Sequence, residues 1–147
     1  MKNAEAQALA YALEIGAAGV EDANEWAYVQ LAEAVDPSEE VLTLMSERSL
    51  ANAISLLHVL GADAVGTETG RLVYRWLLNA VTAKTLPHAR VAEAVVRLAR
   101  EASAPSEEAA NAAWYFDDAF YLAETGIYGS KEEVAAELEL HVKTHAA

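Results

Sequence analysis

The segment Ala104–Val134 reads APSEEAANAAWYFDDAFYLAETGIYGSKEEV. It predicts one full helix that opens at Pro105, a turn flanked by Gly126 and Gly129, and the start of a further helix. The first helix is apolar on two sides, since about 100° per residue places Ala109, Ala112, Ala113, Phe116, Phe120 and Ala123 on one side and Trp114, Tyr121 and Leu122 on the other. A helix that is apolar nearly all round either lies at the centre of a bundle or is buried on one face and bound to a partner on the other.

Composition extends this helical pattern to the whole chain. Its 147 residues are 54% hydrophobic and 22% charged, and a chain of this length buries about 70% of its unfolded surface as one domain. Abundant alanine, leucine and glutamate favour helix over strand, and no long run alternates with period two. We therefore predict an all-α fold: a single domain over residues 1–147 with seven or eight antiparallel helices, arranged as a compact bundle or a short α-solenoid.

The tetrapeptide Pro-Ser-Glu-Glu occurs twice, at 37–40 and again 68 residues later at 105–108. It is a typical helix start, because proline fits the first turn and the glutamates suit the positive end of the helix dipole. Asp36 is placed to cap the first of these helices and Ser130 to cap the last helix of the chain. A two-fold internal repeat explains the offset, and recurrence of common helix-start chemistry in an alanine-rich chain is the alternative.

The formal net charge is −13 and is unevenly distributed. Residues 1–70 hold 12 acidic residues against Lys2 and Arg48, and residues 101–147 hold 10 against Lys131 and Lys143, whereas residues 71–100 hold one acid against six basic residues. An acidic protein attracts basic partners and is repelled by nucleic acid and anionic membranes. We expect a basic protein partner, no nucleic acid and no membrane, with solubility alone as the alternative explanation of the charge.

The chain has no cysteine, which excludes disulfides, thiolate zinc sites and a cysteine nucleophile. Glu5, Gln7 and Glu14 interrupt any signal-peptide core near the amino terminus. No apolar run approaches the roughly 20 residues that cross a bilayer. A soluble cytoplasmic protein is the expectation.

Five neighbouring residues form an aromatic and acidic cluster that we predict to bind a partner: Trp114, Tyr115, Asp117, Asp118 and Tyr121. Aromatic side chains beside carboxylates are a good anchor for a basic protein surface, because binding energy concentrates in such residues. The alternative is that the aromatic residues lie in the core and the aspartates are paired inside the fold.

Arg71 and Arg75 are the predicted ion-pair partners in that alternative. They form, with Thr82, a narrow polar strip between two apolar sides of the helix that precedes Lys84. If this helix and the helix from Pro105 are the two central ones, Arg71 or Arg75 pairs with Asp117 or Asp118, because a lone buried charge is costly.

Glu137, His141 and His145 are spaced by four residues, which places a carboxylate and two imidazoles on one helix face. Such a face is a weak candidate for a divalent metal site. The helix is near the end of the chain, where fraying is typical, so we favour a solvated tail and predict no metal and no cofactor. Similarly, Arg90, Arg97 and Arg100 share a helix side that suits either an anion or solvent.

The sequence contains no catalytic constellation, which favours a protein that is not an enzyme. The predicted function is an acidic helical module that neutralises or scaffolds a basic protein, in the manner of an inhibitor or immunity protein. Two alternatives stay open: a metal- or anion-dependent enzyme or small-ligand binder, and a homo-oligomeric structural protein.

Overall fold

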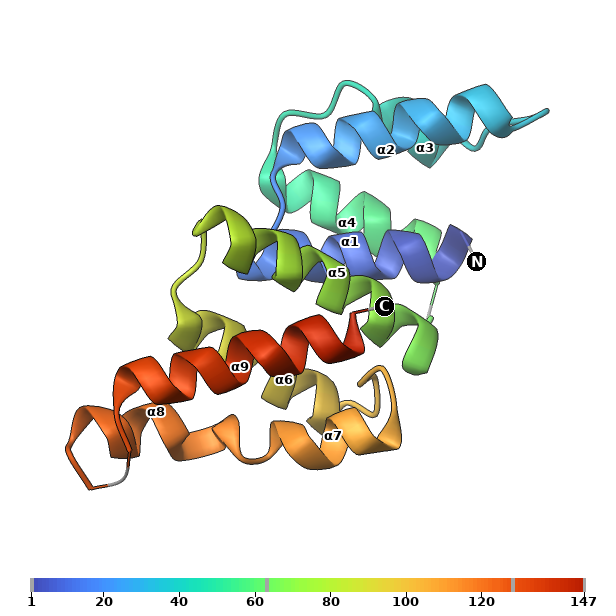
Figure 1. Ribbon diagram of the computed structural model, residues 1–147. Helices are drawn as coiled ribbons and strands as arrows, with labels where there is room; N and C mark the ends of the chain where they lie inside the picture. Colours follow the sequence, from blue (N-terminus) through green and yellow to red (C-terminus); the bar gives the residue numbers. More distant parts are fainter. Residues whose placement is uncertain (1, 63, 128, 147) are drawn as a thin grey trace. The chain divides into compact units, whose positions relative to one another are not determined.

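The computed structural model describes residues 2–62, 64–127 and 129–146, and all regular structure in them is helical (Figure 1). The helices are α1 (Lys2–Ile15), α2 (Val20–Glu33), α3 (Glu39–Leu44), α4 (Leu50–Gly61), α5 (Thr67–Ala83), α6 (His88–Arg100), α7 (Glu107–Ala113), α8 (Phe116–Glu124) and α9 (Lys131–His145). The all-α fold class is confirmed. The chain divides into two compact units, Met1–Ala64 and Val65–Ala147, and a single domain over residues 1–147 stays a prediction.

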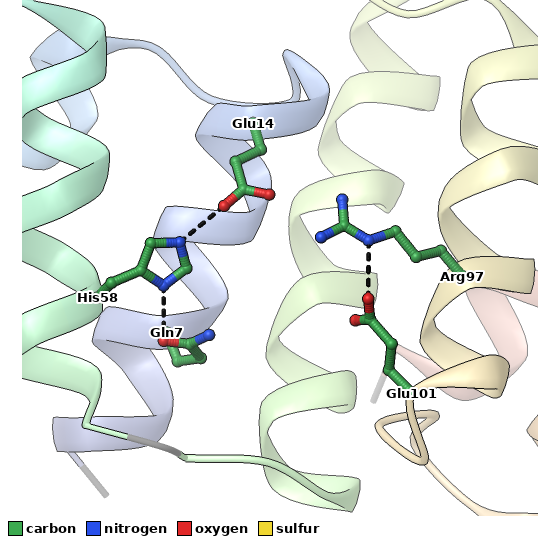
Figure 2. A network of polar contacts seen from close by, with 5 residues as sticks. All are labelled: Gln7, Glu14, His58, Arg97 and Glu101. Atoms are coloured by element: carbon green, nitrogen blue, oxygen red, sulfur yellow. Dashed lines mark hydrogen bonds and ion pairs between the residues drawn. The ribbon is translucent and has the colours of Figure 1, made fainter.

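In the first unit, α1 packs along α4, and α2 and α3 pack on each other. Figure 2 shows the polar contact that joins α1 to α4: His58 Nε2 lies 2.7 Å from Glu14 Oε1, and His58 Nδ1 lies 3.1 Å from Gln7 Oε1. Leu9 and Leu13 of α1 and Leu57 of α4 are fully buried. Hydrophobic burial therefore stabilises the packing of the two helices, and the exposed His58 contacts add a polar link between them.

The start of α3 differs in detail from the prediction. The cap is Ser38, whose hydroxyl accepts from the Val41 amide at 3.3 Å, and not Asp36. Asp36 lies two residues upstream and is exposed. At the other end of α3, the Asn24 side chain donates to the carbonyls of Leu44 and Glu47 at 2.7 and 3.0 Å, which satisfies carbonyls that the helix leaves open.

In the second unit, α5 packs against α9 and α6 packs against α7 and α8. The buried side of α5 carries Val73, Tyr74 and Leu77, all without exposed surface. The predicted cap of α9 is confirmed, since the Ser130 hydroxyl accepts from the Glu133 amide at 3.2 Å. In the part of the chain that the structure describes, no helix combines the length and the apolar character that a membrane span requires.

The helix predicted to run unbroken from Pro105 is divided into α7 and α8 at Trp114 and Tyr115, which brings the count to nine in the described residues (Figure 1). Tyr115 N bonds to Ala112 O at 3.3 Å and Asp117 N to Trp114 O at 3.2 Å, so the chain tightens locally to three-residue turns. Trp114 and Tyr115 keep right-handed helical dihedrals. The break changes which side chains of α8 face outward, while the chain continues in the same general direction from α7 to α8.

The 68-residue offset extends from the tetrapeptide to the helices. The starts of α2 and α6, the starts of α3 and α7, and the ends of α1 and α5 are each separated by 68 residues. The packing differs between the units, because α1 packs on α4 whereas α5 packs on α9, an extra helix. The order of helices and the pairing of α2 with α3 and of α6 with α7 are thus repeated, whereas the partners of α1 and α5 differ.

Gly70 is required by the close approach of the α6–α7 loop to α5. A Cβ at this position would overlap the carbonyl oxygen of Ser103 and lie 2.7 Å from the carbonyl carbon of Ala104. Both loop residues are buried. Because the overlapping atoms belong to the backbone of the loop, they cannot move aside as the flexible end of a long side chain could.

We expect Gly70→Ala to lower the free energy of unfolding by about 2 kcal/mol, because a methyl group forced against backbone overpacks the site. Helix propensity alone would make the alanine variant more stable by about 1 kcal/mol. The change in stability that we predict therefore has the opposite sign to the change expected from propensity. Ala83→Gly, at an exposed position of the same helix, measures the ordinary alanine–glycine difference. Urea denaturation followed by circular dichroism gives both values, and an unchanged or more stable Gly70→Ala protein contradicts the close approach.

Candidate functional site: an aromatic and acidic face on α7 and α8

The predicted partner-binding residues lie on the surface of the second unit. Trp114, Tyr115 and Tyr121 are 45%, 37% and 63% exposed, and Asp117 and Asp118 are exposed as well. Asp118 and Tyr121 are three residues apart on α8, so they lie on the same side of that helix. We call these five residues the aromatic–acidic face. The alternative that places the aromatic residues in the core is wrong for all three.

The opposite side of α8 explains this orientation. Phe116, Ala119 and Ala123 are buried, and they pack α8 against α6 and α9. Phe116 directly follows the break between α7 and α8, and its ring centroid lies 5.0 Å from that of Tyr115 in an edge-to-face contact. Since the apolar stripe of α8 turns inward, the neighbouring positions turn outward.

Arg100, the last residue of α6, connects two members of the face. Its Nη2 lies 3.1 Å from Asp117 Oδ1, and its guanidinium carbon lies 5.9 Å from the centre of the Trp114 ring. Both side chains of the ion pair are more than half exposed, so the pair contributes little to stability and mainly orients the groups. Asp118 has no hydrogen-bond or ion-pair partner among the described residues.

A groove runs beside the face. One hollow of about 290 Å³ lies between α6 and α8, where Val96, Phe120 and Tyr121 contribute to its wall. A second hollow of about 410 Å³ lies between α8 and the start of α9, and it shares Phe120 and Glu124 with the first. The aromatic–acidic face therefore borders a concave and partly apolar surface, which suits contact with another molecule.

The predicted pairing of Arg71 or Arg75 with Asp117 or Asp118 is corrected. Asp117 pairs with Arg100, and Arg75 donates from Nε to the carbonyl oxygen of Ala146 at 3.2 Å. No ion pair joins either arginine of α5 to either aspartate in the described part of the chain. The reason is packing: α8 rests on α6, whose last turn brings Arg100 to Asp117, and α5 rests on α9.

Two of the three residues of the weak metal candidate, Glu137 and His141, have separate hydrogen-bond partners. Glu137 accepts a hydrogen bond from the Tyr115 hydroxyl at 3.2 Å. His141 is buried, and its Nε2 lies 2.7 Å from the Tyr74 hydroxyl. The His145 ring centroid lies 5.0 Å from that of His141. Within residues 2–62, 64–127 and 129–146, no three histidine, aspartate or glutamate side chains are grouped to hold a metal ion.

A solvated tail was the favoured expectation for these residues, and it is wrong for His141. This ring lies among Tyr74 of α5 and Phe116 of α8, with centroid distances of 5.4 and 5.5 Å. Burial, and secondly the positive charge of His145, lower the pKa of His141 from 6.5 to about 4. At neutral pH the ring is uncharged, and the direction of its hydrogen bond with the Tyr74 hydroxyl depends on which ring nitrogen carries the proton.

The arginines of α6 are paired within the fold. Arg90 Nε lies 3.8 Å from Glu93, Arg97 Nε lies 3.0 Å from Glu101 (Figure 2), and Arg100 pairs with Asp117. Each of these arginines already has a carboxylate beside it. The side of α6 therefore favours solvated ion pairs over an anion site.

We predict that His141 titrates with a pKa of about 4 in the folded protein and near 6.5 in urea. Between pH 6.5 and pH 4 the unfolded chain binds a proton that the folded chain does not, so stability falls as the pH is lowered through this range. The contribution lost is about 3 kcal/mol. NMR titration of the His141 ring in buffer and in urea measures both values, and a folded-state pKa near 6.5 would contradict the buried neutral ring.

No family model, no curated protein and no solved structure matches this chain.

Proposed function

We propose that this chain is an acidic helical protein-binding module that binds a basic protein through the aromatic–acidic face, in the manner of an inhibitor or immunity protein. The observation that carries the proposal is the exposure of Trp114, Tyr115 and Tyr121 beside Asp117 and Asp118. Large aromatic side chains are expensive to leave in water, and in protein interfaces they contribute most of the binding energy.

The charges around these aromatic residues favour a basic partner. The Asp118 carboxylate is exposed and has no hydrogen-bond or ion-pair partner among the described residues, so it can pair with a basic side chain of the partner. The positive charge of Arg100 is compensated by Asp117. A net charge of −13 adds a long-range attraction that speeds encounter with a basic protein.

The same charge argues against self-association as the main role, because two copies that each carry −13 repel each other. The metal- or anion-dependent alternatives lack support from the geometry, since Glu137 and His141 have separate partners and the α6 arginines are paired. The proposal includes a soluble cytoplasmic protein that binds neither nucleic acid nor membranes.

The test begins with co-purification of the tagged protein from its native extract at low and moderate salt. A basic partner that is recovered in stoichiometric amount is then purified, and its affinity is measured by calorimetry. We expect Tyr121→Ala to weaken binding roughly 30-fold, or about 2 kcal/mol, because the residue is an exposed anchor of the face. Asp118→Lys should slow association and reduce its salt dependence.

Tyr28→Ala is the matched control. Tyr28 is 65% exposed, as Tyr121 nearly is, but it belongs to α2 of the first unit. We expect this variant to bind like the wild type. Equal affinities for all three proteins would show that the partner binds elsewhere, and a stable dimer without any partner in light scattering would favour the homo-oligomeric alternative.

A further inference from the structure

The hollow of about 290 Å³ between α6 and α8 has a lining that is half apolar. Ala92, Val96 and Phe116 are buried beneath it, and Ala89 and the half-buried Phe120 continue its apolar surface. Ligand sites for drug-sized molecules usually enclose about 300–1,000 Å³. This hollow therefore suits one side chain of another protein better than a separate ligand.

Five polar side chains complete the lining, and all of them are exposed to solvent. They are the three carboxylates of Glu93, Asp117 and Glu124, the guanidinium of Arg100 and the phenol of Tyr121. A group that enters from outside can therefore reach each of them. Carboxylates outnumber cations by three to one in this lining, which favours a positively charged group.

The charge differs between the two ends of the hollow. Arg100 and Asp117 form an ion pair at one end, with a distance of 3.1 Å. Glu93 precedes Arg100 by seven residues on α6, and seven residues of helix span about 10 Å. Glu124 follows Asp117 by seven residues on α8, and with Ala89 it also lines the second hollow, which the ion pair does not reach. Both glutamates therefore lie at the end away from the ion pair.

These two glutamates keep acceptor capacity. Glu93 lies 3.8 Å from Arg90, and Glu124 lies 3.3 Å from Lys131. All four side chains are more than half exposed, so the two pairs are weak, and neither cation lines this hollow. Because an ionised carboxylate has two oxygens and about four acceptor positions, each glutamate can accept from a further donor.

The aromatic part of the lining favours a guanidinium over an ammonium as that donor. Phe120 and Tyr121 lie about one turn before Glu124 on α8, so their rings are neighbours of its carboxylate. A guanidinium is planar and weakly hydrated, stacks on aromatic rings and bonds carboxylates through two parallel N–H groups, whereas an ammonium is a strongly hydrated point charge. Arg100 makes such a contact on this surface, with its guanidinium carbon 5.9 Å from the centre of the Trp114 ring.

We propose that the hollow between α6 and α8 receives an arginine side chain of the basic protein partner. The methylene groups of that arginine lie on Val96 and Phe120, and its guanidinium donates to Glu93 and Glu124. The inference rests on the proposed function, because it names the side chain that the partner presents beside the aromatic–acidic face. Arginine is also among the residues that contribute most to binding energy in interfaces.

NMR titration of the whole chain with Nα-acetyl-arginine methylamide tests the hollow without any partner. We expect saturable shifts of the backbone amides of Glu93, Val96 and Tyr121, and about tenfold weaker binding of Nα-acetyl-lysine methylamide. Nα-acetyl-citrulline methylamide has nearly the same shape but no charge, and sodium chloride supplies the same ionic strength, so neither should produce these shifts. No saturable shift, or an equal response to the citrulline compound, would overturn the proposal, and equal binding of the lysine compound would overturn the choice of arginine.

Two substitutions at exposed positions locate the guanidinium. We expect Glu93→Gln and Glu124→Gln each to weaken binding of the arginine compound about threefold and the double variant about tenfold, because each removes one charged acceptor. Glu101→Gln is the matched control, since Glu101 is also exposed and also pairs with an arginine of α6, Arg97, but lies outside the lining. An equal loss in Glu101→Gln would show general attraction to an acidic surface and overturn the site.

Calorimetry with the purified partner separates this inference from the proposed function. We expect the double variant Glu93→Gln, Glu124→Gln to bind the partner about tenfold more weakly. If Tyr121→Ala weakens binding and the double variant does not, the arginine assignment is wrong and the proposed function stands. If neither variant changes the affinity, the proposed function is contradicted as well.

Discussion

The hydrogen bond between Tyr74 and His141 is the constraint on which the second unit depends. Tyr74 has no exposed surface, so its hydroxyl requires a partner inside the protein. The neutral His141 ring supplies that partner at 2.7 Å and in doing so holds α9 against α5. Phe116 packs against the same imidazole, which turns the apolar side of α8 inward. Asp117, Asp118 and Tyr121 consequently face outward, so the exposure of the proposed binding face follows from a buried contact between residues 67 positions apart.

The two units have the same order of helices but differ in how some of these helices pack. In the first unit α1 pairs with α4, and the polar link is the His58 contact to Glu14 and Gln7 at the surface. In the second unit the extra helix α9 takes the place beside α5, and the polar link is buried. The buried side of α8 packs against both α6 and α9, which leaves Asp117, Asp118 and Tyr121 exposed.

The sequence was sufficient for the fold class, because periodicity, alanine content and capping chemistry act locally. Ser130 capped its helix as predicted. What failed depended on long-range packing. The spacing of His141 shows that it shares a helix face with Glu137, but not that this face meets Tyr74. From the sequence alone, Asp117 could pair with any nearby cation. Only the packing of α8 on α6 determines that Asp117 pairs with Arg100 and not with Arg75. The burial of Gln30 could not be predicted from the sequence, since a glutamine in a helix of mixed polarity is typical of a solvated position.

The excess of acidic residues supports the proposal of a basic partner. A small domain stays soluble with a net charge of roughly 2–8, so −9 within residues 1–64 alone exceeds what solubility needs and destabilises the compact state by self-repulsion. Ion pairs inside the fold relieve this repulsion for α6, where each arginine has an acidic neighbour. The first unit has only two basic residues with which to do the same. A basic protein partner, as proposed, would compensate part of this charge, and its binding would stabilise the fold in proportion to its affinity.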